Sequence, residues 1–105
     1  MKIENQIIFR IREKIHEIEP TAKIILYGSY ARGDNRDNSD IDLLILIEKD
    51  KITLSDEKMI KYPLFDIEFD TGQIISPLLF TKNEWENKHK ITPFYENVNK
   101  EGIEL

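Results

Sequence analysis

The chain has 105 residues, of which 40% are hydrophobic and 33% are charged, and its formal net charge is −5. This length suits a single domain over residues 1–105 with a small core, which a partner chain or a homo-oligomer would help to complete. The negative charge argues against direct nucleic-acid binding, and a chain without cysteine can form neither disulfides nor thiolate metal sites. The first twenty residues are charged throughout and no apolar run could span a bilayer, so we expect no signal peptide, no membrane contact and a cytoplasmic location.

The first half of the chain predicts one helix followed by two strands. Isoleucines at helical spacing predict an amphipathic helix over residues 2–18, which Pro20 ends. Residues 22–27 (AKIILY) are short, apolar and β-branched, which favours a strand, and a polar loop over residues 28–39 follows. Residues 41–47 (IDLLILI) are apolar on almost every position, which predicts a strand in the middle of a sheet.

The middle of the chain is less definite. Residues 48–56 are polar and are expected to form a loop. Apolar and acidic residues alternate over 65–70, which would suit a strand, but the same stretch also fits one face of a helix. Pro63 is typical of a first helical turn and Gly72 of a helix cap, so we favour a short helix between them.

The last third predicts a strand and two helices. Residues 73–80 (QIISPLLF) form the third predicted strand, and Pro77 inside it favours an edge position or a bulge. A T-x-x-E capping box predicts a helix over residues 82–90, and a Thr-Pro pair predicts a last short helix over residues 92–102.

Two aspartates, Asp40 and Asp42, stand two residues apart at the start of the second predicted strand. Side chains at this spacing project from the same face, with Cα atoms about 6.5–7 Å apart. Neighbouring carboxylates repel each other, and in a half-buried place one of them would tend to protonate. A Mg²⁺ ion removes this conflict, because it binds one or two carboxylates together with substrate phosphates. The pair is therefore a candidate catalytic and metal site.

A glycine-serine turn, Gly28-Ser29, directly follows the first predicted strand. Glycine allows a sharp turn and a close approach of a ligand to backbone N–H groups, and successive N–H groups form an anion-binding nest. The Ser29 hydroxyl adds a donor and Arg32 adds positive charge, whereas Arg36 is more simply a surface charge. The loop thus offers phosphate donors on one side and metal ligands on the other, which is what a nucleoside triphosphate with its magnesium requires.

Gly28-Ser29, ten further residues and then Asp40-Ile41-Asp42 form the GS-x10-D-x-D pattern of the nucleotidyltransferase superfamily related to DNA polymerase β. The longer text GSYARG…SDIDLLI resembles the minimal nucleotidyltransferases of that superfamily, and the match lies within residues 24–47. The resemblance implies an α/β (α+β) fold like the polymerase β palm, with a small mixed β-sheet and helices on one side.

The resemblance also implies roles for the motif residues. Gly28 and Ser29, with Arg32 as a secondary contact, would hold the phosphates, and Asp40 and Asp42 would bind Mg²⁺. A substrate hydroxyl would attack the α-phosphorus while pyrophosphate leaves, so that catalysis rests on positioning and charge neutralisation. By family analogy the expected reaction moves AMP from ATP onto a hydroxyl of a partner protein, preferably that of a tyrosine.

Fully active relatives usually supply a third carboxylate from a later strand, and the predicted strand over residues 73–80 contains no acid. Asp66 or Glu68 could serve if residues 64–70 formed a strand instead of a helix. The missing acid leaves open whether the site transfers nucleotides at a full rate.

Minimal nucleotidyltransferases are often the antitoxins of toxin–antitoxin modules, so the resemblance implies a small all-helical RNase toxin of the HEPN type as partner. The apolar chain end, Ile103 and Leu105, is compatible with such a partner. Two alternatives stay open. The protein could be an antitoxin that neutralises its toxin by contact, with a weak or silent nucleotide site, or it could be a nucleotide sensor.

Overall fold

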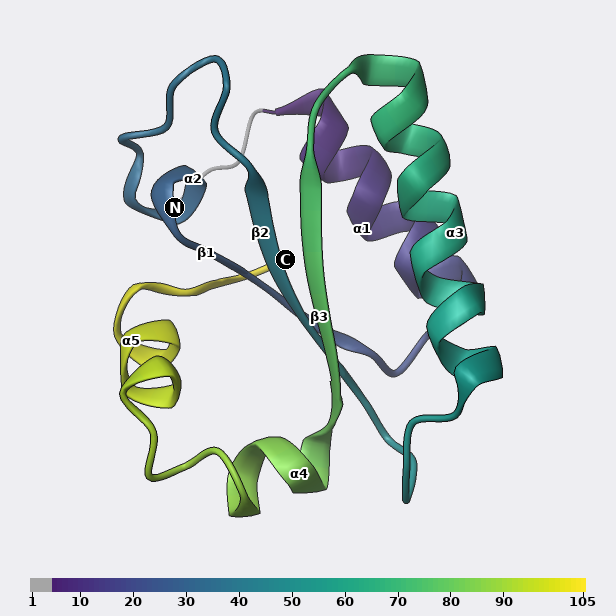
Figure 1. Cartoon of the computed structure of the whole chain (residues 1–105), viewed down its shortest axis with the longest axis vertical. Coiled ribbons are helices and arrows are strands. Elements are labelled where there is room, and N and C mark those ends of the chain that lie inside the picture. Colours follow the sequence, from purple (N-terminus) through teal and green to yellow (C-terminus); the bar gives the residue numbers. More distant parts are fainter. Residues whose placement is uncertain (1–4) are drawn as a thin grey trace.

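The computed structural model describes residues 5–105, which form helices on both sides of a small sheet (Figure 1). In chain order the elements are α1 (Gln6–Ile18), β1 (Lys23–Tyr27), α2 (Ser29–Arg32), β2 (Ile41–Ile47), α3 (Leu54–Thr71), β3 (Ile75–Thr81), α4 (Lys82–Asn87), α5 (Pro93–Glu101) and β4 (Ile103–Glu104). The predicted start of the first helix, residues 2–4, lies outside the described residues. Among these residues no helix has the length and the apolar character that a membrane crossing requires.

The sheet is mixed and has the strand order β3-β2-β1-β4. Strand β2 is central: it pairs antiparallel with β1 and parallel with β3, while β4 pairs antiparallel with the other edge of β1. The prediction of a central strand for the IDLLILI segment is therefore confirmed. Strand β3 lies at an edge, where Pro77 does not interrupt an interior ladder, as its presence predicted.

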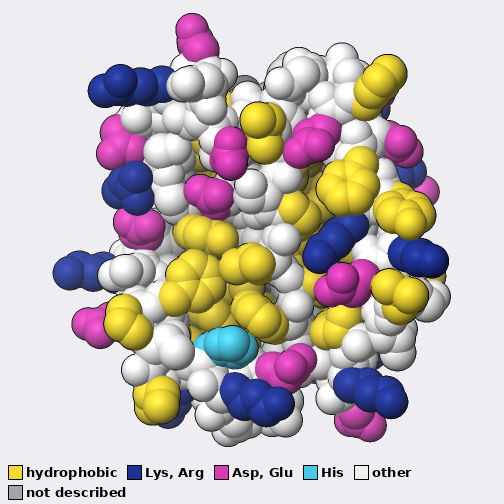
Figure 2. Space-filling model, viewed as in Figure 1, with side chains coloured by type: hydrophobic (Ala, Val, Ile, Leu, Met, Phe, Trp, Pro, Cys, Tyr) yellow, Lys and Arg dark blue, Asp and Glu magenta, His cyan; other side chains and the backbone are white. Residues whose placement is uncertain are grey.

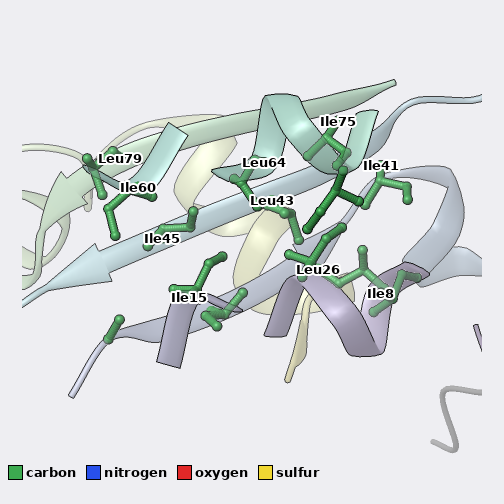
Figure 3. Packing of buried hydrophobic residues seen from close by; sticks show 14 of the residues in the cluster. Ile8, Ile15, Leu26, Ile41, Leu43, Ile45, Ile60, Leu64, Ile75 and Leu79 are labelled. Carbon is green, nitrogen blue, oxygen red and sulfur yellow. The ribbon is translucent and has the colours of Figure 1, made fainter. Parts of the chain in front are cut away.

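Helices α1 and α3 pack side by side on one face of the sheet and enclose the larger core (Figure 3). The isoleucine stripe of α1 contributes Ile8, Ile11 and Ile15, all buried. Alternate residues of the central strand, among them Leu43 and Ile45, meet this layer from the sheet. The α/β class and the mixed sheet agree with the prediction.

The expectation that helices cover only one side of the sheet is wrong. The α4–α5 segment lies against the opposite face, where Trp85 and Val98 pack with Ile25, Leu44 and Leu46 (Figure 1). The physical reason is that β2 is apolar at successive positions, so both of its faces must be covered. Asp42 shares a face of β2 with Leu44 and Leu46, because side chains two residues apart on a strand point the same way, so the candidate site lies on the α4–α5 side of the sheet.

The helix of the middle segment is much longer than predicted. The strand alternative is excluded, but α3 begins at Leu54 instead of near Pro63, because Thr53 and Asp56 form a capping box there. Pro63 lies inside the helix, where a proline is normally unfavourable. Burial of Ile60 and Leu64 on either side of it against the sheet holds the two halves in one helix.

The chain end completes the sheet. Ile103 pairs with Leu26 of β1, and the Leu105 N–H donates to the Ile24 carbonyl oxygen at 2.9 Å. The apolar chain end, interpreted from the sequence as compatible with a partner, is thus used within the chain itself. Its strand β4 also brings the end of α5 next to the turn that follows β1.

Candidate functional site

The Gly-Ser turn and the second aspartate are in direct contact. Gly28 has φ 75° and ψ −155°, a conformation that is essentially restricted to glycine. A Cβ atom at this position would collide with Asp42 Oδ2 and lie 3.2 Å from Asp42 Cγ. The register explains this closeness, because Asp42 lies opposite Tyr27, the residue before the turn. Glycine is therefore needed at position 28 for its backbone conformation and for the space of the carboxylate.

The two aspartates share one face and one end of the sheet. Ser76 on β3 lies in register with Asp42, and its Oγ donates to Asp40 Oδ2 at 3.1 Å. Asp40 is exposed, whereas Asp42 is half-buried. Figure 2 shows acidic side chains gathered on the upper part of this face, above a hydrophobic patch. The structure thus brings Asp40, Asp42 and the Gly28 turn together, as the motif predicted.

The carboxylates of Asp40 and Asp42 repel each other. Burial, and then the negative charge of Asp40, raise the pKa of Asp42 above its ordinary value, while the positive charge of Arg32 opposes this shift. Burial, and then the charge of Asp42, likewise raise the pKa of Tyr27 to about 12. Ionised Asp42 therefore lies in a place that disfavours negative charge, and a bound cation would relieve this cost.

The pair of aspartates suits Mg²⁺ in its chemistry. Carboxylate oxygens are the hard ligands that this ion prefers, and the repulsion between Asp40 and Asp42 is what a shared cation would neutralise. Among residues 5–105 no further acid or histidine joins them in a group of three that could hold a metal. A bound ion would therefore take its other ligands from substrate phosphates and water.

Helix α2 holds the remaining motif residues next to the turn. It begins with Ser29 directly after Gly28 and ends with Arg32, in the stretch predicted to be a loop. The Tyr30 hydroxyl donates to Gln73 Oε1 at 2.9 Å, which ties the helix to the segment that precedes β3. Arg32 is half-exposed and lies near enough to Asp42 to lower its pKa.

Asp66 and Glu68 do not complete the site. Both belong to α3, which covers the opposite face of the sheet from Asp40 and Asp42. Glu68 Oε1 accepts a hydrogen bond from the Ile75 N–H at 2.7 Å, so its role is to fix the start of β3. The strand on which a third carboxylate was expected presents the Ser76 hydroxyl beside the aspartates instead.

Glu101 is the site residue that sequence analysis missed. Its carboxylate accepts hydrogen bonds from the Gly28 N–H at 3.4 Å and from Arg32 Nη1 at 3.3 and 3.4 Å. It is the last residue of α5, some seventy residues after the turn, and no local pattern connects the two positions. The pairing of β4 with β1 brings this carboxylate to Gly28 and Arg32.

A glycine turn next to paired carboxylates, on a mixed sheet flanked by helices, is the arrangement that the GS-x10-D-x-D motif predicted. The family described as "Nucleotidyltransferase domain" matches residues 8–96 of this chain. The chain therefore belongs to the nucleotidyltransferase family and is an enzyme of that class, as the motif predicted.

Two relatives come from Methanocaldococcus jannaschii and carry provisional names as protein adenylyltransferases. MJ0141 is 33% identical over 84 residues, which cover 79% of this chain and 77% of the relative. MJ0604 is 39% identical over 83 residues, which cover 76% and 73% respectively. These similarities confirm the resemblance to minimal nucleotidyltransferases.

A solved structure described as a toxin-antitoxin with AMP-PNP has a similar fold. Its TM-score is 0.59 at 18% identity, and the alignment covers 97% of this chain and 72% of that chain. At this level of identity the similarity shows the shared fold alone.

Proposed function

We propose that this protein transfers AMP from ATP onto a hydroxyl of a partner protein, as the cytoplasmic antitoxin of a pair whose toxin is an all-helical RNase of the HEPN type. The observation that carries the transferase part is the contact between the Gly28 turn and Asp42. A phosphate-binding turn and a metal-binding carboxylate must be neighbours if one triphosphate is to use both.

In this proposal Gly28, Ser29 and Arg32 hold the phosphates, and Asp40 and Asp42 hold Mg²⁺. Bound there, the ion would supply neutralisation of phosphate charge. The acceptor oxygen forms a bond to the α-phosphorus while the bond to the bridging oxygen breaks, and pyrophosphate leaves with that electron pair. The hydroxyl proton passes to water. The turn and the helix α2 act by holding the triphosphate tail in line for this displacement.

The choice of adenylyl transfer to a protein draws on the relatives, whose names assign them that activity. The choice of a toxin partner draws on the similar fold within a toxin–antitoxin complex. A surface of this chain also supports a protein partner. Helix α3 exposes a row of large apolar side chains, and Figure 2 shows hydrophobic side chains among basic ones on that side of the molecule. The row consists of Leu54, Met59, Tyr62, Phe65 and Phe69. Exposed apolar surface of this kind marks interaction sites in soluble proteins.

A second candidate function is neutralisation by contact alone. Ser76 stands beside the aspartates where a third carboxylate is expected for full activity. A site without that acid could bind nucleotide and turn it over slowly, so that binding to the toxin would be the main activity.

The two candidates are separated by one experiment. The protein is incubated with α-labelled ATP, Mg²⁺ and the protein encoded by the neighbouring gene. Transfer of label that disappears in the variant Asp40→Asn with Asp42→Asn supports the transferase. Inhibition of the partner that persists in this variant supports contact alone. Absence of both label transfer and nucleotide binding in the wild type would refute the proposed transferase.

A further inference from the structure

We propose that Glu101 is an internal anion that competes with the triphosphate for its binding groups, and thereby sets the nucleotide affinity of this site. The inference rests on the proposed function, because it takes the Gly28 amide and Arg32 as phosphate donors. It assigns a role to a residue of α5, outside the GS-x10-D-x-D motif.

The contacts of Glu101 are those that a phosphate would make. Its carboxylate accepts from the Gly28 N–H at 3.4 Å and from Arg32 Nη1 at 3.3 and 3.4 Å. A carboxylate and a phosphate are both anionic oxygen acceptors, so they use the same amide and guanidinium donors. A triphosphate that enters this turn must therefore displace the carboxylate or share its donors.

The backbone position of Glu101 is fixed by the residues that follow it. Gly102, the next residue, begins the passage into β4, and a Cβ atom there would collide with the Val98 carbonyl oxygen and lie 2.6 Å from Ile25 Cγ2. Ile103 then pairs with Leu26, two residues before Gly28. The end of α5 is thus packed tightly against β1, which fixes the backbone of Glu101 beside the turn.

The interaction is weak enough to be displaced. The side chain of Glu101 is 29% exposed and that of Arg32 is 47% exposed, and ion pairs at this level of exposure contribute little. Displacement of the carboxylate from the turn breaks one long hydrogen bond from the Gly28 N–H and one exposed ion pair with Arg32. A magnesium-bound triphosphate brings several charged oxygens and replaces a single carboxylate, so nucleotide binds in spite of the competition but less tightly than it would without Glu101.

The test is the variant Glu101→Gln, which keeps the size of the side chain and removes its charge. We expect Mg·ATP, measured by calorimetry, to bind to Glu101→Gln about 2- to 5-fold more tightly than to the wild type, since one exposed ion pair no longer competes. Sodium triphosphate with Mg²⁺ should show the same gain, because the competition concerns only the phosphates. The variant Glu101→Asp, with a shorter reach, should fall between the two and serves if Glu101→Gln folds poorly.

The matched control is Glu96→Gln, on the same helix and exposed, which removes one negative charge away from the turn. The affinity of Glu96→Gln for Mg·ATP should stay within about 1.5-fold of the wild type, which separates local competition from a general charge effect. In an Arg32→Gln background the gain from Glu101→Gln should shrink, because the two residues are coupled.

The outcomes distinguish the inference from the proposed function. If the wild type binds Mg·ATP and Glu101→Gln binds it equally or less tightly, Glu101 does not compete, and the site itself stands. An equal gain in Glu96→Gln also overturns the competition. If no variant and no wild-type protein binds Mg·ATP or triphosphate, the proposed function fails and this role fails with it.

Discussion

Replacement of Gly28 by alanine should remove activity through the position of Asp42. Gly28 has φ 75° and ψ −155°, and forcing a residue with a Cβ atom into this region costs about 1–3 kcal/mol. The new Cβ atom would also collide with Asp42 Oδ2, so the carboxylate must leave its rotamer, at about 0.5–1.5 kcal/mol. We therefore expect a loss of about 1.5–4.5 kcal/mol in the free energy of unfolding.

Such a loss corresponds to a thermal midpoint lower by about 7–20 °C for a domain of this size. Activity, corrected for the folded fraction, should fall roughly 100-fold, because a catalytic group displaced by about 1 Å loses its alignment. Circular dichroism melts give the first quantity, and transfer of α-labelled ATP below the transition gives the second.

Gly33 provides the matched control. It also has a positive φ, 82°, but a Cβ atom there would meet no other atom within 4 Å. Gly33→Ala should therefore cost about 1 kcal/mol from backbone conformation alone and keep its activity within about 3-fold. The two glycines differ in ψ, −155° against 12°, as well as in the neighbouring carboxylate, so Gly33→Ala shows the cost of a positive φ without a collision.

Two results would refute this reasoning. One is wild-type activity in folded Gly28→Ala. The other is an unchanged cost of Gly28→Ala in an Asp42→Ala background, where the collision with the carboxylate is absent and only the conformational part should remain.

Three further predictions concern charge and surface. The raised pKa of Asp42 means that ionisation of this carboxyl destabilises the folded protein. The cost is absent below the unfolded-state pKa and complete above the folded-state pKa. Asp42→Asn should therefore melt higher than the wild type at pH 7 without metal. The same variant should lose about 100-fold or more in activity and show no Mg²⁺-dependent rise in melting temperature, whereas the wild type shows one; equal Mg²⁺ stabilisation of both would contradict the metal site. Lys49 lowers the pKa of buried Asp56 to about 2, so Asp56→Asn should melt lower at pH 7, and melts in a pH series should show this difference shrink as pH falls from about 4 to 2. Phe69 is 92% exposed, so Phe69→Glu should leave the melting temperature nearly unchanged and abolish co-purification with the protein of the neighbouring gene; unchanged co-purification would exclude this surface.

The sequence alone determined the part of the site that is local in the chain. The turn at Gly28 and the aspartates at 40 and 42 flank one loop between two strands, and apolar patterns identify both strands. Once β1 and β2 pair antiparallel, the turn and the aspartates must meet at one end of the sheet. The apolar patterns of the two strands and the spacing of the motif were therefore enough to predict that Gly28 lies near Asp40 and Asp42.

The extent of the middle helix shows where local patterns compete. The capping box of Thr53 and Asp56 lies in a stretch that was expected to be a loop, and the predicted helix start near Pro63 was wrong. Burial of Ile60 and Leu64 against the sheet keeps the helix continuous through Pro63. Burial is a property of the folded chain, so a local pattern does not show it. The same tertiary packing excluded Asp66 and Glu68 from the site.

Tertiary structure alone decided which groups from the second half of the chain reach the turn. The parallel register of β3 on β2 places Ser76 beside Asp42, and the short strand β4 places Glu101 against Gly28. Such pairings depend on register between distant segments, where a shift of one residue would turn every side chain to the other face. No periodicity within a single segment carries that information. The sequence therefore predicted that Gly28, Asp40 and Asp42 lie together, but not that Glu101 joins them.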